Sequence, residues 1–223
     1  MIDATGNGGD GTLNALPDRT TEVPVDPIPG TGAPNTQSLH LNWVDTSNGG
    51  LVRVPDAGGF LTGGGSSFTL EAWVKLDHVS DTSGADQRQW LCQKKPAGTP
   101  DTQLDYSVLV QAGNLGPTGR ELAFRWGDGA SSSGVWSNLR IEDTEWHFVS
   151  VSYDVASRNL RFGLDGAFEL ISIDRSGFAN TGELVIGGHE SGSGVPNHFM
   201  RGSIDEFRMT RAYLAPELLL DSE

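Results

Sequence analysis

The sequence predicts an all-β fold, a two-sheet antiparallel sandwich of jelly-roll type. About a dozen short runs alternate apolar and polar residues, which is the period of a half-buried strand. The 223 residues include 30 Gly and 11 Pro, a composition typical of proteins rich in turns. Only residues 216–220 have a helical pattern, with Pro216 in the first turn and Glu217 after it.

Short turns separate the predicted strands, and no linker or internal repeat divides them. Residues 17–35 are rich in Pro, Thr and Gly, and the sequence predicts an extended surface loop over 14–37. We therefore expect one domain over residues 1–223. In chain order, the strands are predicted at 39–43, 51–54, 68–76, 89–94, 106–111, 121–126, 135–141, 146–153, 160–164, 168–173, 183–186 and 200–209.

Two of these segments have the strongest patterns. Residues 68–76 place Phe68, Leu70 and three further apolar residues on one face, with Trp73 among polar residues on the other. Residues 160–167 contain Asp165-Gly166, a pair typical of a two-residue hairpin turn.

Composition and charge exclude several classes of function. The formal net charge of −14 disfavours nucleic acid and anionic lipid as partners. The single cysteine, Cys92, excludes an intrachain disulfide and a cysteine-based zinc site, and its strand-like surroundings predict a buried thiol. No apolar run reaches the length of a membrane span, and no signal sequence precedes the first motif. We expect the chain to be part of a longer secreted protein, with neighbouring domains.

The last predicted strand has two adjacent carboxylates, Asp205 and Glu206, which must point to opposite faces. Arg208 shares the face of Glu206 and can neutralise it. Asp205 shares its face with Phe207 and Met209, which has the character of a core face. A carboxylate there needs a partner: a hard cation such as calcium, a nearby Arg, or backbone amides.

Residues 3–13 are dense in Gly, Asn and Asp, which tolerate left-handed backbone and supply oxygen ligands. The spacing is not that of an EF-hand, because the closing glutamate is missing. A flexible turn is the alternative to a calcium loop.

Five motifs in order give the chain a family resemblance. They are DATGNGGDGTL at 3–13, FTLEAWV at 68–74, WHFV with SYD at 146–154, LDG at 164–166 and GSIDEFR at 202–208. This series resembles the laminin-G-like domains of the concanavalin A-like lectin/glucanase superfamily. The resemblance covers nearly the whole chain and implies an extracellular antiparallel jelly roll, often with one calcium ion.

The resemblance also implies that the opening segment and the closing strand lie side by side, where family members often hold a cation. Asp205 with Asp3 or Asp10, the Asn7 side chain and backbone carbonyls near Gly8 would then bind structural calcium. The rival is an ion pair from Arg201 or Arg211 to Asp205. The chain departs from the family in long inserts at 77–87 and 96–105, which would shape a binding surface if they lie on the sheet rim.

A non-catalytic module that binds a glycan or an extracellular protein is the first function class. Aromatic rings beside charged groups suit sugar recognition. Trp73 and Trp146 fall in fold motifs, so the predicted ligand-binding residues are Trp90, Trp126, Trp136, Arg88, Arg125 and Tyr106.

A structural or adhesion spacer within a large surface protein is the alternative, and a glycoside hydrolase or lyase is a third class. The glucanase relatives carry their acids as Glu-x-Asp-x-x-Glu on one strand, and no such run occurs here. The five histidines are scattered without metal-ligand spacing. We therefore expect no enzymatic activity.

Overall fold

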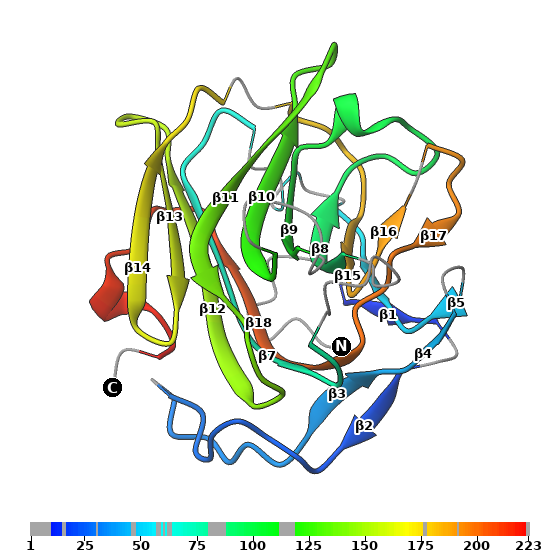
Figure 1. The fold of residues 1–223 in the computed structure, drawn as a ribbon, viewed down its shortest axis with the longest axis vertical. Helices are drawn as coiled ribbons and strands as arrows, with labels where there is room; N and C mark the ends of the chain where they lie inside the picture. Colours follow the sequence, from blue (N-terminus) through cyan, green and yellow to red (C-terminus); the bar gives the residue numbers. More distant parts are fainter. Residues whose placement is uncertain are drawn as a thin grey trace.

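The computed structural model describes residues 10–14, 17–29, 31–45, 48–56, 59, 61, 64–79, 88–111, 119–175, 178–190 and 192–221. Two seven-stranded antiparallel sheets form a sandwich, as predicted (Figure 1). The first sheet has the order β1-β6-β15-β8-β9-β10-β11, and the second has the order β14-β13-β12-β7-β18-β3-β2. None of the described helices has the length and apolar character needed to cross a bilayer.

The strands of the first sheet are β1 (Thr12–Leu13), β6 (Val52–Val54), β15 (Leu184–Ile186), β8 (Gln89–Lys94), β9 (Tyr106–Val110), β10 (Glu121–Gly127) and β11 (Ser132–Arg140). Those of the second are β14 (Ala167–Ser172), β13 (Asn159–Leu164), β12 (Trp146–Asp154), β7 (Phe68–Leu76), β18 (Gly202–Thr210), β3 (Ser38–Leu41) and β2 (Asp18–Thr20). Two small hairpins pair β4 (Trp43–Asp45) with β5 (Asn48–Gly49) and β16 (His189–Glu190) with β17 (Pro196–Asn197).

Most of the predicted strands occur within a few residues of their expected bounds. The observed elements differ from the predicted ones in three places. The predicted strand 39–43 is divided between β3 and β4, and β2 lies within the predicted loop 14–37 because it pairs with β3. The predicted helix 216–220 is a single 3-10 turn, η2 (Pro216–Leu218). A second 3-10 turn, η1 (Asp101–Gln103), lies in the insert 96–105.

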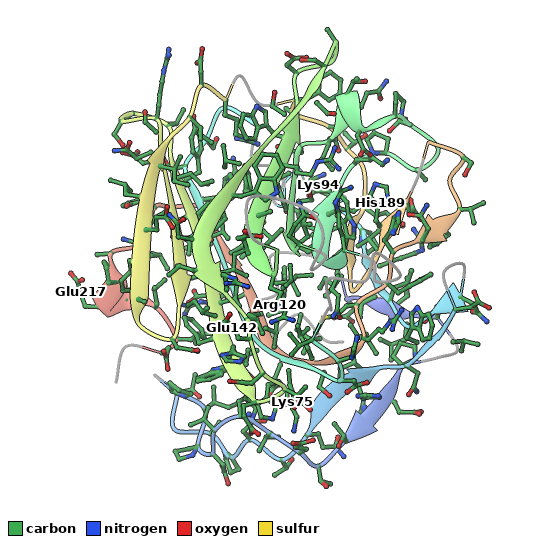
Figure 2. The ribbon with its side chains drawn as sticks, viewed as in Figure 1. Lys75, Lys94, Arg120, Glu142, His189 and Glu217 are labelled. Carbon is green, nitrogen blue, oxygen red and sulfur yellow. The ribbon has the colours of Figure 1, made fainter. Side chains whose placement is uncertain are left out.

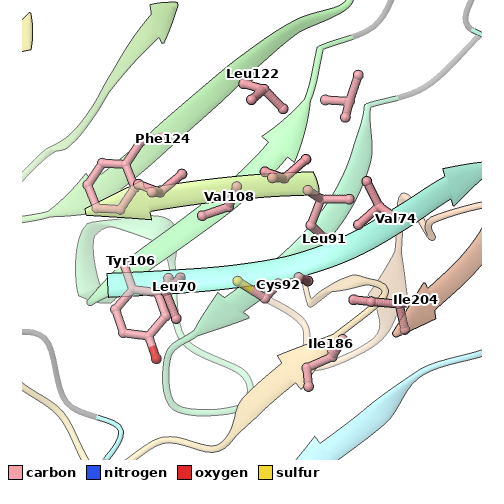
Figure 3. Close-up of a cluster of buried hydrophobic side chains, with 14 of the residues drawn as sticks. Leu70, Val74, Leu91, Cys92, Tyr106, Val108, Leu122, Phe124, Ile186 and Ile204 are labelled. Atoms are coloured by element: carbon pink, nitrogen blue, oxygen red, sulfur yellow. The ribbon is translucent and has the colours of Figure 1, made fainter. Parts of the chain in front are cut away.

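One apolar core fills the space between the two sheets (Figure 3). Leu70 and Val74 of β7 face Val108 and Phe124 of the first sheet, which confirms the alternation predicted for 68–76. Each fully buried aliphatic or aromatic side chain of this kind stabilises the fold by roughly 1.5–3 kcal/mol. Cys92 is buried in the same cluster, which confirms the predicted buried thiol, and burial raises its pKa to about 12.

The face predicted for Asp205 is wrong, because β18 contains a bulge. The pairing of β18 with β7 shifts between Asp205 and Arg208, and Glu206 has a left-handed φ of 47°. A bulge inserts an extra residue and reverses the alternation beyond it. Asp205 therefore lies opposite Trp73 on the outer face of the second sheet, whereas Phe207 and Met209 pack against the core.

Arg208 also has a different partner from the one predicted. It forms its ion pair with the buried carboxylate of Glu71 on β7, not with Glu206. Burial raises the pKa of Glu71, while the Leu220 amide and Arg208 act in the opposite direction.

The C-terminal segment lies against the outer face of the second sheet. The Thr69 hydroxyl donates to the Ala212 carbonyl at 2.8 Å and accepts from the Leu214 amide at 3.0 Å. The Leu220 amide donates to Glu71 at 2.9 Å. In Figure 1 this segment, in red, runs beside β13 and β14.

His147 of β12 lies between two carboxylates, Asp165 in the hairpin turn of β13 and β14 and Asp143 in the turn before β12. His147 Nδ1 lies 2.6 Å from Asp165, and Nε2 lies 3.0 Å from Asp143. The hydrogen bond to Asp165 raises the pKa of His147, burial lowers it, and the two carboxylates together give a net increase.

We expect His147→Gln to destabilise the protein at pH 5.5 by about 0.5–1 kcal/mol and to have a smaller effect at pH 8.5. A raised folded pKa stabilises fully below the unfolded value of about 6.5, and this contribution is lost as the pH rises through the folded pKa. Urea unfolding at both pH values measures the difference.

Asp165→Asn is the matched control. Asn tolerates the φ of 49° at this turn position, and its side-chain oxygen can still accept from the Phe148 amide. It should remove most of the pH dependence attributable to His147. An equal cost of His147→Gln at both pH values would contradict the charged pairing.

Candidate binding surface

The outer face of the first sheet presents an apolar row across four strands. Register places Trp90 of β8 opposite Leu109 of β9, Leu109 opposite Ala123 of β10, and Ala123 opposite Trp136 of β11. The first three pack together and are buried, whereas Trp136 is 41% exposed. The row therefore ends in an accessible indole.

A polar row runs beside it on the same face. Gln93 lies opposite Ser107, Ser107 opposite Arg125, and Arg125 opposite Gly134. A Cβ at Gly134 would lie 3.0 Å from Cγ of Arg125, so glycine leaves room for the Arg125 side chain. Diagonal neighbours on one face of a sheet lie about 7–8 Å apart, so Arg125 and Trp136 are within reach of one ligand.

Two short elements, η1 and β16, cover the end of this face near β8. Asp101 of η1 accepts from Lys95 at 3.0 Å and from Arg125 at 3.1 Å, and lies 3.2 Å from Nε2 of His189. His189 also contacts Asn197 of β17 through Nδ1 at 2.7 Å. Figure 2 labels His189 on β16, which lies against β8.

The charge of Asp101 is strongly favoured at this position. Burial raises its pKa, but hydrogen bonding and attraction from His189 and Lys95 outweigh burial and hold the pKa well below the ordinary range. The carboxylate is therefore ionised at physiological pH and links η1 to β10 and β16.

Trp90 lies beneath this assembly. Its ring centroid is 4.1 Å from that of His189, and the Arg125 guanidinium lies 5.5 Å from the Trp90 ring. Both contacts are within the range of favourable aromatic and cation–π packing. Trp90 is only 1% exposed, so it supports the charged groups above it instead of offering its own face to solvent.

Arg88 and His198 extend the charged region. Nε of Arg88 donates to Gln111 at 2.8 Å. Burial lowers the pKa of Arg88, the Arg125 charge lowers it further, and Asp101 opposes both. The His198 ring lies 6.0 Å from that of His189, and burial, His189 and Arg88 lower its pKa. We call Arg88, Lys95, Arg125, His189 and His198 the basic cluster.

Four of the six predicted ligand residues lie on this face: Trp90, Trp136, Arg88 and Arg125. Tyr106 and Trp126 belong to the core, where the Tyr106 hydroxyl donates to the Leu61 carbonyl at 2.9 Å. A role in binding for any of the six stays a prediction.

The sequence prediction did not include Asp101, Lys95, His189 or His198. One signal for Asp101 was present, because it lies in the insert 96–105 that was expected to shape a binding surface. The two histidines border the turn-rich run 190–197, which pattern alone assigned to a loop.

Of the predicted calcium ligands, the structure describes Asp205 and Asp10, whereas Asp3, Asn7 and Gly8 lie outside the described residues. Asp205 accepts from Asn35 Nδ2 at 2.7 Å and from the Glu206 amide at 3.0 Å. Burial raises its pKa, and these two hydrogen bonds oppose the rise. No group of three or more His, Cys, Asp or Glu in the described part of the chain could hold a metal ion.

The described residues thus give Asp205 two hydrogen-bond donors and supply no metal shell, so the calcium site stays a prediction. The rival ion pair is not formed either: Arg201 lies over the Trp43 ring at 3.6 Å, and no described ion pair joins Asp205 to Arg201 or Arg211.

If calcium binds, it should add roughly 2.7 kcal/mol to stability at 100 times its Kd, because it binds the folded state alone. Thermal melts in calcium and in chelator measure the shift, and Asp205→Asn should abolish it. Identical melts of the wild-type protein in both buffers would remove calcium from the account.

The model of the concanavalin A-like lectin/glucanase superfamily, a laminin-G-type model, matches residues 46–218. Among curated protein sequences, no relative matches significantly.

Several solved structures have a similar fold. The binding domain of botulinum neurotoxin DC, solved in complex with rat synaptotagmin II, has a TM-score of 0.66 and 11% identity, covering 99% of this chain and 47% of that one. Botulinum neurotoxin type C, whose uptake by cells depends on interaction with two ganglioside molecules, has a TM-score of 0.65 and 12% identity, covering 97% and 46%.

The binding domain of Paraclostridial Mosquitocidal Protein 1 has a TM-score of 0.63 and 13% identity, covering 98% and 48%. The chain thus spans about half the length of the structures it matches. At these identities the likeness is one of fold.

Proposed function

The chain belongs to the concanavalin A-like lectin/glucanase superfamily, and on that premise we propose that it is a non-catalytic extracellular module that binds carbohydrate on the outer face of its first sheet. Binding of an extracellular protein on the same face is the second form of this proposal. A structural spacer of a larger surface protein is the alternative.

The observation that carries the proposal is the exposed indole of Trp136, whose diagonal neighbour on the same face is Arg125 of the basic cluster. Indole rings pack against the apolar faces of sugars, and neighbouring charged groups hydrogen-bond to sugar hydroxyls. On the second sheet Phe168 is also exposed beside Arg161, but the Arg161 guanidinium is already engaged by the Leu214 carbonyl of the C-terminal segment.

The structural neighbours support a binding role. One was solved with rat synaptotagmin II bound, and cell entry of the other toxin depends on interaction with two ganglioside molecules. Both are about twice as long as this chain, so their ligands suggest classes to test and no more.

The surroundings of three glutamates, Glu71, Glu142 and Glu145, support a role without catalysis. Glu71 is buried and paired with Arg208, and Glu142 is paired with Arg140 at 3.3 Å. Glu145 is exposed in the turn before β12. The family resemblance supports the extracellular setting and structural calcium.

We expect the purified protein to bind a subset of glycans on an array and Trp136→Ala to weaken that binding by about tenfold or more, as loss of an aromatic anchor does. Titration calorimetry with the best glycan measures the loss, and repeating it in chelator tests whether calcium takes part. The loss of stability should be smaller than for truncation of a core aromatic residue, because 41% of Trp136 is exposed.

Phe168→Ala is the matched control, because Phe168 is 42% exposed on the other sheet. It should leave binding unchanged. No binding on the array would favour the spacer, and equal losses for the two variants would contradict the proposed face. Release of reducing ends from bound glycans above background would contradict a role without catalysis.

A further inference from the structure

The basic cluster carries more positive charge than its described neighbours neutralise. Lys95 and Arg125 share the carboxylate of Asp101, and Arg88 forms no ion pair with a described residue. Arg88 and Arg125 are close enough for each to oppose the charge of the other. Three cations around one carboxylate are an unusual feature on a chain of net charge −14.

His198 provides a second, independent observation. Its Nδ1 is buried and has no hydrogen-bond partner within the described structure. Its backbone has a left-handed φ of 50°, which is uncommon for a residue other than glycine and costs conformational energy. Buried polar atoms without partners are rare in folded proteins, so Nδ1 of His198 keeps unused hydrogen-bonding capacity at the cluster.

Buried polar groups beside the cluster also lack partners. The Gln93 amide and the Ser107 hydroxyl, neighbours of Arg125 in the polar row, have no hydrogen bond within the described structure, and neither does Nε1 of Trp90. All three residues are at most 1% exposed. These groups therefore retain unused hydrogen-bonding capacity beneath the cluster.

We propose that Arg88, Arg125 and His198 bind an anionic substituent, a carboxylate or a sulfate, carried by the saccharide that packs on Trp136. Arg88 retains guanidinium N–H donors beyond the one it gives to Gln111, and these can form charge-assisted hydrogen bonds with the anion. Asp101 does not fill this role, because Lys95, Arg125 and His189 already surround its carboxylate.

This inference rests on the proposed carbohydrate-binding function, and its test separates the two. The probes are oligogalacturonate for carboxylate, heparin oligosaccharides for sulfate, and carboxyl-reduced oligogalacturonate and desulfated heparin as neutralised partners of each. Titration calorimetry is run on the whole chain at about 0.15 M salt, where distant charges are screened.

The expected result is that at least one acidic probe binds about tenfold or more tightly than its neutralised partner, and that Arg88→Gln removes this preference. Arg158→Gln is the matched control, because Arg158 is an exposed cation of the second sheet and its loss changes the net charge equally. It should have no effect. His198→Gly removes the ring where glycine accepts the same backbone, so it should weaken acidic probes without lowering the melting temperature.

Binding of a neutralised partner as tight as that of its acidic form would overturn the anion site and leave carbohydrate binding intact. So would equal effects of Arg88→Gln and Arg158→Gln. Absence of binding to every probe and to the glycan array would instead overturn the proposed function. Which acidic probe is preferred decides between carboxylate and sulfate.

Discussion

The candidate surface depends on one carboxylate, Asp101, which three basic side chains share. Lys95 follows β8, Arg125 lies on β10 and His189 lies on β16, so one side chain of η1 joins three separate parts of the chain. Lys95 is fully buried and Arg125 is largely so. Loss of the shared carboxylate would leave these cations close together with no described counter-charge, and breaking buried pairs in this way is strongly destabilising. The side chains of His189 and Arg125 both pack on the ring of Trp90.

The same interaction explains how an acidic protein can present a basic face. Net charge acts over distance, but at physiological salt the screening length is about 8 Å. Within that range the local groups decide what binds, and here cations outnumber carboxylates. The second sheet differs, because Arg208 and Arg161 are engaged by Glu71 and by the C-terminal segment. The arginines of the second sheet are therefore paired within the protein. On the first sheet, Arg88 keeps hydrogen-bond donors that a ligand can use.

The fold could be predicted closely because its determinants are local. The alternation over 68–76 and the Asp165-Gly166 turn each specify an element within a few residues, and both occur as expected. The face of Asp205 could not be predicted, because one bulged residue at Glu206 reverses the alternation and nothing in the sequence marks it.

The site could be predicted only in part. Trp90, Trp136, Arg88 and Arg125 were found from residue type, but strand register decides that Tyr106 and Trp126 point into the core. The two histidines of the cluster, His189 and His198, lie far along the chain from Arg88, so no spacing in the sequence reports their proximity.

Binding of a ligand to the outer face of the first sheet can be tested directly, because the six tryptophans report on different parts of the fold. In a ¹⁵N-labelled sample, each indole N–H gives a separate NMR signal that can be assigned by substitution. On titration with the saccharide that binds most tightly, the account predicts that the signals of Trp136 and Trp90 shift, while those of Trp73 and Trp146 in the second sheet do not. Shifts confined to Trp73 and Trp146 would contradict it.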